Sequence, residues 1–211
     1  MFIGFLVDMK INSINNFISF KKQLVATGAY LSNGESRPCF FYQLKGEEDK
    51  LYLNNILQEK EWKETELADD LADNLIKFPN DEYYSIEDFN GNCLGVTEIY
   101  NEKFKGKESK KIHIIETCPT LSAKNKERKE KYIGESLLAF IVKLCKRENK
   151  EMIYVPVVYE TARDFYKNKC HFEEKIREDE MEDLPVFLMR KDFDNLITQN
   201  ENHTQEQIEF V

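Results

Sequence analysis

At 211 residues the chain is long enough for one domain with a sizeable hydrophobic core. Hydrophobic residues make up 41% of it and aromatic residues 12%, a composition that is typical of globular proteins and excludes a disordered chain. The net charge of −9 argues against a general nucleic-acid-binding protein, which carries a basic face. It favours cationic partners such as amines or basic protein tails, although solubility alone would also explain it.

The cysteine pattern and the apolar runs limit other classes. The five cysteines are widely scattered and form no Cys-x-x-Cys pair, so we expect no metal site. Their odd number and apolar neighbours predict reduced thiols and a cytoplasmic location. The apolar run Met1–Val7 is too short for a signal-peptide core and is interrupted by Asp8. No stretch approaches the ~18 apolar residues of a transmembrane helix, so we expect no membrane span.

Residues 1–37 form the first unit that we distinguish, an N-terminal extension. Phe2–Val7 is typical of a short strand, and Asn12 or Ser13 could cap a helix that ends at Gly28. The apolar side of this helix would consist of Ile14, Phe17, Ile18, Leu24 and Val25. The extension could cover a sheet edge or form an interface, for example in a homodimer.

The second unit, residues 38–194, begins with a strand signal and two helix signals. Cys39–Leu44 is typical of a strand and would be the first strand of this unit. Apolar residues then recur at helical spacing in residues 51–57 and in Thr65–Phe78. Pro79 ends the second of these predicted helices.

A β-hairpin is the strongest local signal in the first half of the chain. Tyr83–Phe89 and Cys93–Tyr100 are rich in strand-forming residues and flank the pair Asn90-Gly91. This pair favours a two-residue type I′ turn. The charged stretch Asn101–Lys111 that follows is predicted to be a loop.

The stretch from Ile112 to Leu138 organises the rest of the chain. Ile112–Ile115 is a short apolar run typical of a buried strand, and Pro119 ends it. A polar loop follows, and Gly134 opens a helix that runs to about residue 149 with one apolar face. The basic side chains of the loop are Lys124, Lys126, Arg128, Lys129 and Lys131. Because a helix start has unpaired N–H groups and the positive dipole end, this order predicts a phosphate site, with a solvated charge run as the alternative.

The remaining part of the second unit is predicted to contain strands and a short helix. Met152–Val158 is typical of a buried strand that has a bulge or a splayed end at Pro156. Thr161–Lys169 is predicted to be helical. The closing strands would be Phe172–Arg177 and Pro185–Met189. Residues 195–211 are polar, and we interpret them as a C-terminal tail, frayed or forming an added helix, that cofactor binding does not require.

The segment Lys129–Gly134, followed by Glu135-Ser136-Leu137-Leu138, resembles the pyrophosphate loop of the GNAT superfamily of acyl-CoA-dependent N-acetyltransferases. The family motif reads Gln/Arg-x-x-Gly-x-Gly/Ala and precedes a helix with a Leu-Leu pair. Met152–Val158 is similar to the fifth strand of the family, and Ala162–Tyr166 is similar to its Ala-x-x-Phe-Tyr helix. Tyr132 stands in place of the first glycine of the motif, and a lysine in place of its Gln/Arg.

The resemblance implies a mixed α/β fold, with a mostly antiparallel sheet, a central pair of parallel strands and flanking helices, to which residues 1–37 are added. It implies an enzyme that transfers an acetyl group from acetyl-CoA to a primary amine of a small molecule or a protein. The contacts to acetyl-CoA would come from Thr117, Cys118, Lys129, Glu130, Lys131, Tyr132, Ile133, Gly134, Glu135 and Ser136. The acidic residues between 59 and 73 would then be a wall of an amine-binding groove or simply a solvated surface.

Two residues are candidates for the chemistry that the resemblance implies. Tyr166 aligns with a family tyrosine near the thioester sulfur and could protonate the leaving thiolate, provided that Phe165 buries into the core and Tyr166 faces the cleft. Glu116 is expected on the same strand face as Ile112 and Ile114 and could relay a proton from the amine. A core tyrosine and a structural carboxylate are the alternatives. His113, on the opposite face, is interpreted as a core histidine.

The sequence is also compatible with a second function. The substituted glycine of the motif also favours a catalytically inactive GNAT-like domain that serves as a protein-interaction or acyl-CoA-sensing module.

Overall fold

The computed structural model describes residues 22–57, 62, 66–121, 129–156, 158, 160–174 and 186–211. Within them ten strands form one sheet in the order β10-β1-β2-β3-β4-β5-β7-β9-β8, with β6 beside β1. The strands are β1 (Gln23–Ser32), β2 (Glu35–Leu44), β3 (Glu82–Asp88), β4 (Cys93–Phe104), β5 (Lys107–Thr117), β6 (Glu130–Lys131), β7 (Met152–Val155), β8 (Glu173–Glu174), β9 (Val186–Met189) and β10 (Glu209–Phe210). The helices are α1 (Gly46–Leu57), α2 (Glu66–Lys77), α3 (Ile133–Arg147), α4 (Glu160–Asp164) and α5 (Phe193–Thr204). A π-helical turn follows α4 at Phe165–Lys169, and short 3-10 turns lie at Pro119–Leu121 and Arg190–Asp192.

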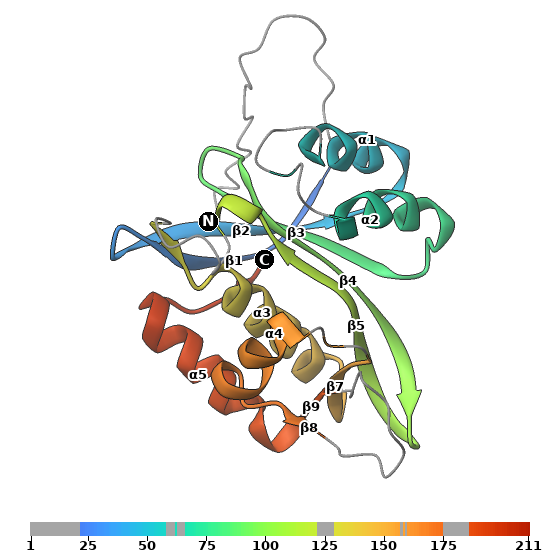
Figure 1. Ribbon diagram of the computed structural model, residues 1–211, viewed down its shortest axis with the longest axis vertical. Coiled ribbons are helices and arrows are strands. Elements are labelled where there is room, and N and C mark those ends of the chain that lie inside the picture. Colours follow the sequence, from blue (N-terminus) through green and yellow to red (C-terminus); the bar gives the residue numbers. More distant parts are fainter. Residues whose placement is uncertain are drawn as a thin grey trace, which may run out of the picture.

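The sheet is antiparallel except for one central pair, β5 and β7, which run parallel. Helices α1 and α2 pack on one face of the sheet, here called the α2 face (Figure 1). Helices α3 and α5 pack on the other, the α3 face, where the larger hydrophobic core lies. The fold class expected from the sequence is therefore confirmed.

The first described strand, β1, corrects the prediction for the N-terminal residues. The helix predicted to end at Gly28 is wrong in its described part, because residues 23–32 pair with β2 across the two-residue turn Asn33-Gly34. Both turn residues have positive φ, 54° and 83°, as a type I′ turn requires. A Cβ at Gly28 would lie 3.1 Å from Phe41 and 3.0 Å from Ile208, so this glycine allows close approach within the sheet. The boundary predicted after residue 37 lies inside β2, and residues 1–21 lie outside the described part.

The hairpin of β3 and β4 is confirmed, but its turn is not of type I′. Gly91 has a φ of 83°, whereas Asn90 is not among the described residues with positive φ. The Asp88 carboxylate accepts hydrogen bonds from the backbone N–H groups of Asn90 and Asn92, each at 2.8 Å. These two hydrogen bonds to the Asp88 side chain explain why the turn differs from type I′, since aspartate can cap the residues that follow it.

The charged stretch predicted to be a loop is a second long hairpin. β4 continues to Phe104, and β5 begins at Lys107. The turn residues Lys105 and Gly106 have φ values of 52° and 80°. Both strands project beyond the helices at the lower right of Figure 1. These charged residues form strands because β4 and β5 pair with each other along one antiparallel ladder up to the turn.

The C-terminal residues interpreted as a tail are packed against the core. They form most of helix α5 and the whole of strand β10, which pairs with β1. Asn200 is buried, and its amide donates a hydrogen bond of 3.0 Å to Ser136 Oγ in α3. Lys143 of α3 donates to the carbonyl of Ile208 at 2.8 Å. The segment therefore belongs to the α3 face of the fold.

The five cysteines are all buried as thiols. In the described ranges no helix is both long and apolar enough to cross a membrane. The same ranges contain no group of three or more His, Cys, Asp or Glu side chains that could hold a metal ion.

Candidate functional site

The parallel strands β5 and β7 separate near the middle of the sheet. Their ladder pairs Ser109 with Met152, Lys110 with Ile153 and Lys111 with Tyr154. Among the described strands, β5 pairs with β4 alone from Ile112 to Thr117, whereas β7 ends at Val155, before Pro156. The splayed end predicted at Pro156 agrees with this geometry. Alternate backbone groups of β5 beyond Lys111 therefore face a gap instead of a neighbouring strand.

The first turn of α3 lies at the end of this gap. A Cβ on Gly134 would lie 3.6 Å from Thr117 Cγ2 of β5 and 3.6 Å from Phe165 Cζ, next to α4. The first helical hydrogen bond runs from Ser136 N–H to Tyr132 O, at 2.8 Å. The N–H groups of Ile133, Gly134 and Glu135 precede it and have no partner inside the helix. The end of β5, the start of α3 and Phe165 thus converge at one point.

Tyr132 adopts the left-handed conformation that a glycine would adopt easily. It precedes α3 with φ 66° and ψ 13°. Its ring stacks on the His203 ring of α5, with centroids 4.4 Å apart and an interplanar angle of 15°. A tyrosine in this conformation is strained, and the stack supplies contacts that offset part of the strain.

The side chains predicted to contact the cofactor divide into two groups. Lys129, Lys131 and Gly134 are at least partly exposed, and Thr117 is half-buried. The others are buried or have partners within the fold. Ser136 Oγ donates a hydrogen bond to Ala29 O at 2.9 Å, and Glu130 Oε1 accepts one from Ser32 Oγ at 3.2 Å. Cys118 Sγ lies 3.3 Å from Thr120 Oγ1. Ile133 belongs to the hydrophobic core. Lys124, Lys126 and Arg128 lie outside the described residues.

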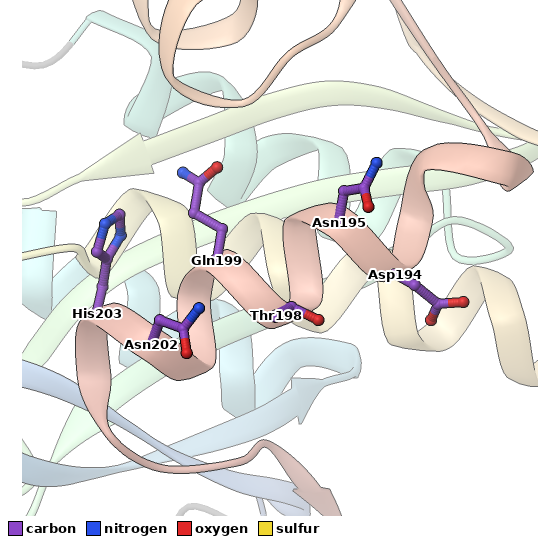
Figure 2. A pocket seen from close by; sticks show the side chains of 6 residues that line it. All are labelled: Asp194, Asn195, Thr198, Gln199, Asn202 and His203. Atoms are coloured by element: carbon purple, nitrogen blue, oxygen red, sulfur yellow. The ribbon is translucent and has the colours of Figure 1, made fainter.

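Helix α5 reaches the start of α3 through two side chains that the sequence analysis did not identify. Glu135 is buried, and its carboxylate lies 2.8 Å from His203 Nδ1 and accepts a hydrogen bond of 3.1 Å from Gln199 Nε2. Gln199 and His203 project from α5 next to a shallow depression (Figure 2). The depression is lined by Asp194, Asn195, Thr198, Gln199, Asn202 and His203. The backbone of α3, rather than the Glu135 carboxylate, is therefore the part of this turn that suits an anion.

Tyr166 is oriented differently from the expectation. It is 4% exposed and packs between Phe165 and Phe172, at ring distances of 5.2 and 5.3 Å, whereas Phe165 is the residue that is partly exposed. The order of burial predicted for these two residues is wrong, because the π-helical turn at Phe165–Lys169 changes the spacing of an α-helix. Burial raises the pKa of Tyr166 well above its usual range.

A bulge in β5 changes which strand face carries Glu116. Ile99 pairs with Ile112 and Glu98 pairs with Ile114, so His113 is an extra residue. Ile112 accordingly belongs to the core on the α3 face and Ile114 to the core on the α2 face. Glu116 alternates with Ile114, so the predicted shared face with Ile112 is wrong.

The same bulge brings together two residues that the sequence analysis did not combine. His113 Nδ1 lies 3.1 Å from Glu98 Oε2 on the α2 face. Counted outward from Lys105-Gly106, these residues are equally distant from the turn. Assigning the second hairpin correctly would therefore have predicted them as cross-strand neighbours.

Comparisons with known proteins agree with this geometry at the level of fold. The sequence matches no protein-family model and no curated protein. A structure from Desulfovibrio desulfuricans, assigned to the GNAT family of acetyltransferases, has a TM-score of 0.52 at 12% identity, over 72% of this chain and 99% of that chain. One from Lactobacillus plantarum, assigned as an N-acetyltransferase, has a TM-score of 0.50 at 11% identity, over 72% and 95%. A mutant of the toxin AtaT, bound to acetyl-CoA and the C-terminus of the antitoxin AtaR, has a TM-score of 0.47 at 15% identity, over 62% and 85%. The chain has the GNAT fold.

Proposed function

We propose that the protein is an acyl-CoA-dependent N-acetyltransferase that transfers an acetyl group from acetyl-CoA to a primary amine. The observation that carries the proposal is the separation of β5 from β7 directly beside the first turn of α3. A gap between parallel strands can receive an extended thiol arm, and a helix start beside it suits a pyrophosphate. The GNAT fold supports the same placement.

The residues around the gap suit the parts of the cofactor differently. The N–H groups of Ile133, Gly134 and Glu135 would bind pyrophosphate oxygens, and Lys129 and Lys131, both exposed, would add positive charge. The half-buried Thr117 would lie beside the arm. Backbone N–H groups of β5 in the gap would stabilise the oxyanion that forms when the thioester carbonyl is attacked.

Transfer to an amine also requires proton movements. Lysine-like amines have pKa values of ~10.4 and must lose a proton before they attack. Glu116 lies on the α2 face and is one carboxylate that could relay this proton. Tyr166 is a candidate donor to the departing thiolate. Because burial raises its pKa, it would act by donating a hydrogen bond rather than by losing its proton completely.

Calorimetry with acetyl-CoA tests the cofactor site through Gly134. Gly134→Val should weaken acetyl-CoA affinity at least tenfold, because a branched side chain would block approach to the α3 backbone. Gly134→Ala should fold normally, since its added Cβ meets Thr117 and Phe165 at ordinary contact distance, and should raise stability by about 0.5–1 kcal/mol.

The alanine variant is the matched control for folding. An affinity that stays at the wild-type value in folded Gly134→Val would place the cofactor elsewhere. Wild-type protein that releases no heat with acetyl-CoA, and shows no shift of its melting temperature, would reject the proposed function.

Tyr166→Phe tests the proposed hydrogen bond to sulfur. The variant keeps the ring that packs between Phe165 and Phe172 and removes only the hydroxyl. We expect kcat to fall roughly 10²-fold with unchanged acetyl-CoA affinity, because the lost interaction forms as charge develops on sulfur. Wild-type kcat in steady-state measurements of CoA release would make Tyr166 a core residue only.

The burial of Tyr166 and the internal partners of Glu135 and Ser136 favour a second candidate function. In this case the protein would bind acyl-CoA, or a protein partner, without transfer. Binding of acetyl-CoA without CoA release in the presence of any primary amine would distinguish it from the enzyme. The cationic acceptor, a homodimer, the absence of a nucleic-acid partner and a cytoplasmic location stay predictions.

A further inference from the structure

A carboxylate–imidazole pair lies on the α2 face where β5 leaves β7. His113 follows Lys111, the last residue of β5 that pairs with β7, by two positions. Its Nδ1 lies 3.1 Å from Glu98 Oε2 of the neighbouring strand. The bulge at His113 directs its side chain to the same face as Ile114, and opposite to the core that contains Ile112.

The Glu98 carboxylate is held firmly in place. It is 1% exposed and accepts a hydrogen bond of 3.1 Å from Asn74 Nδ2 in α2. Its other oxygen accepts a hydrogen bond of 3.4 Å from the Tyr83 hydroxyl, which itself donates to Asn74 O at 2.8 Å. An amide and a phenol from two other elements thus fix the carboxylate that faces the imidazole.

The imidazole, in contrast, is accessible. Its side chain is 47% exposed, although that of Glu98 is buried. Because a carboxylate only accepts hydrogen bonds, the 3.1 Å contact favours the neutral tautomer with its proton on Nδ1, which leaves Nε2 to take up a proton. Orientation of one imidazole nitrogen by a buried carboxylate is the arrangement that a general base requires.

We propose that His113 is the general base for the acceptor amine and that Glu98 is the positioning residue that sets its tautomer. The inference rests on the proposed function, and the base would be His113 instead of Glu116. A gap between strands opens to both faces of a sheet. A thioester in the gap between β5 and β7 can therefore be attacked from the α2 face, where His113 lies.

The proton balance is complete without a further reactant. Nε2 of His113 takes one proton from the ammonium and returns it to solvent. The neutral nitrogen attacks the carbonyl carbon, and the C–S bond breaks with its electron pair on sulfur. The second nitrogen proton passes to this thiolate, so the products are an amide, CoA thiol and one released proton.

The surrounding charges also favour a cationic acceptor. Asp81 interacts electrostatically with Glu98 and His113, and its pKa is raised by burial, with a further contribution from Glu98. The Tyr100 ring of β4 lies 6.2 Å from the His113 ring, and Lys111 Nζ lies over Tyr100. Among the described residues, the carboxylates of Asp81 and Glu98 outweigh the ammonium of Lys111 near the imidazole, which gives this site a negative field that attracts an ammonium group.

NMR of ¹⁵N-labelled histidines tests the geometry without any acceptor. The chain has three histidines, so the signals can be assigned by substitution. At a pH where His113 is neutral, we expect the proton on Nδ1 and none on Nε2. Glu98→Gln should populate the other tautomer, because an amide can donate as well as accept. A neutral His113 protonated on Nε2 in the wild type would overturn the proposal.

The kinetic test uses n-butylamine and spermidine as acceptors and measures CoA release against pH. The wild-type profile should have an acid limb, because only the neutral imidazole accepts a proton. His113→Gln should lower kcat 10²- to 10⁴-fold and remove this limb, with acetyl-CoA affinity unchanged. Glu98→Gln should lower kcat by a smaller factor, again with acetyl-CoA affinity unchanged, because the imidazole keeps its position in the strand but loses the carboxylate that sets its tautomer.

His171→Asn is the matched control. His171 is exposed and has a φ of 57°, a conformation that asparagine tolerates. The pH–rate profile of this variant should therefore equal that of the wild type. A limb that survives in His113→Gln and disappears in Glu116→Gln would assign the base to Glu116. Wild-type protein that binds acetyl-CoA but acetylates neither amine would reject both the enzyme and its base, whereas an active His113→Gln rejects only the base.

Discussion

A chain truncated after Asp194 should lose the native fold and, with it, acetyl-CoA binding. The truncation removes the buried side chains of Leu196, Ile197 and Ile208. Each contributes about 1.5–3 kcal/mol when it is buried, and the sum is comparable to the total stability of a domain, about 5–15 kcal/mol. It also leaves Ser136 without its bond from Asn200. Circular dichroism and urea denaturation measure the loss.

Substitutions on the other side of α5 provide the matched control. Thr198→Ala and Asn202→Ala change exposed residues of the same helix and should alter the free energy of unfolding by less than about 0.5 kcal/mol. Leu196→Ala, at a buried position, should cost about 2–5 kcal/mol. A truncated chain that melts cooperatively at the wild-type temperature would show that α5 is an appendage, as the sequence analysis expected.

Local patterns in the sequence predicted those parts of the fold that local interactions determine. The order of β5, α3 and β7 followed from a β-branched run, a helical apolar face and a second apolar run. A bulge or splayed end was predicted at Pro156, which cannot donate to a ladder, although the predicted strand continued to Val158 and β7 ends at Val155. The start of α3 was predicted within one residue, since it depends on the helical period of its own residues.

Other parts depend on pairings between distant segments, which periodicity does not reveal. β1 was taken for part of a helix because Leu24 and Val25 continue an apolar pattern, although Asn33-Gly34 turns the chain into a hairpin. The polar α5 was taken for a tail because its buried Asn200 is matched by Ser136, 64 positions earlier. Such a polar contact has no signal in either segment alone.

In the candidate site, too, local patterns predicted some features, whereas others depend on pairing between strands. The start of α3 was predicted from the loop and glycine beside it, whereas Glu116 was predicted to share a strand face with both Ile112 and Ile114 and shares one with Ile114 alone. The error has one cause, the bulge at His113, which shifts the alternation of β5 by one residue. A strict period of two places Ile112 and Ile114 together, and only the cross-strand register separates them.

Lys110→Met should destabilise the protein by about 3 kcal/mol, because it leaves two carboxylates facing each other across a buried position. Lys110 is 0% exposed, and its Nζ lies 2.5 Å from Glu82 Oε1 and 2.9 Å from Glu148 Oε2. It also donates to Asn101 Oδ1 at 3.3 Å. This ammonium therefore joins β3, β4 and β5 to the residue that follows α3. The value is at the low end for a broken buried pair, because Glu82 and Glu148 keep part of their contact with water.

Two further variants separate the uncompensated charge from the lost packing. The triple variant Lys110→Met, Glu82→Gln, Glu148→Gln should regain most of the loss, because neutral amides need no counter-charge at this site. Lys103→Met is the matched control, since Lys103 pairs with Glu108 in the same hairpin at 3.0 Å but is exposed. It should change the free energy of unfolding by at most about 0.5 kcal/mol. If urea denaturation gives equal losses for Lys110→Met and the triple variant, packing of the lysine stem, and not its charge, stabilises this junction.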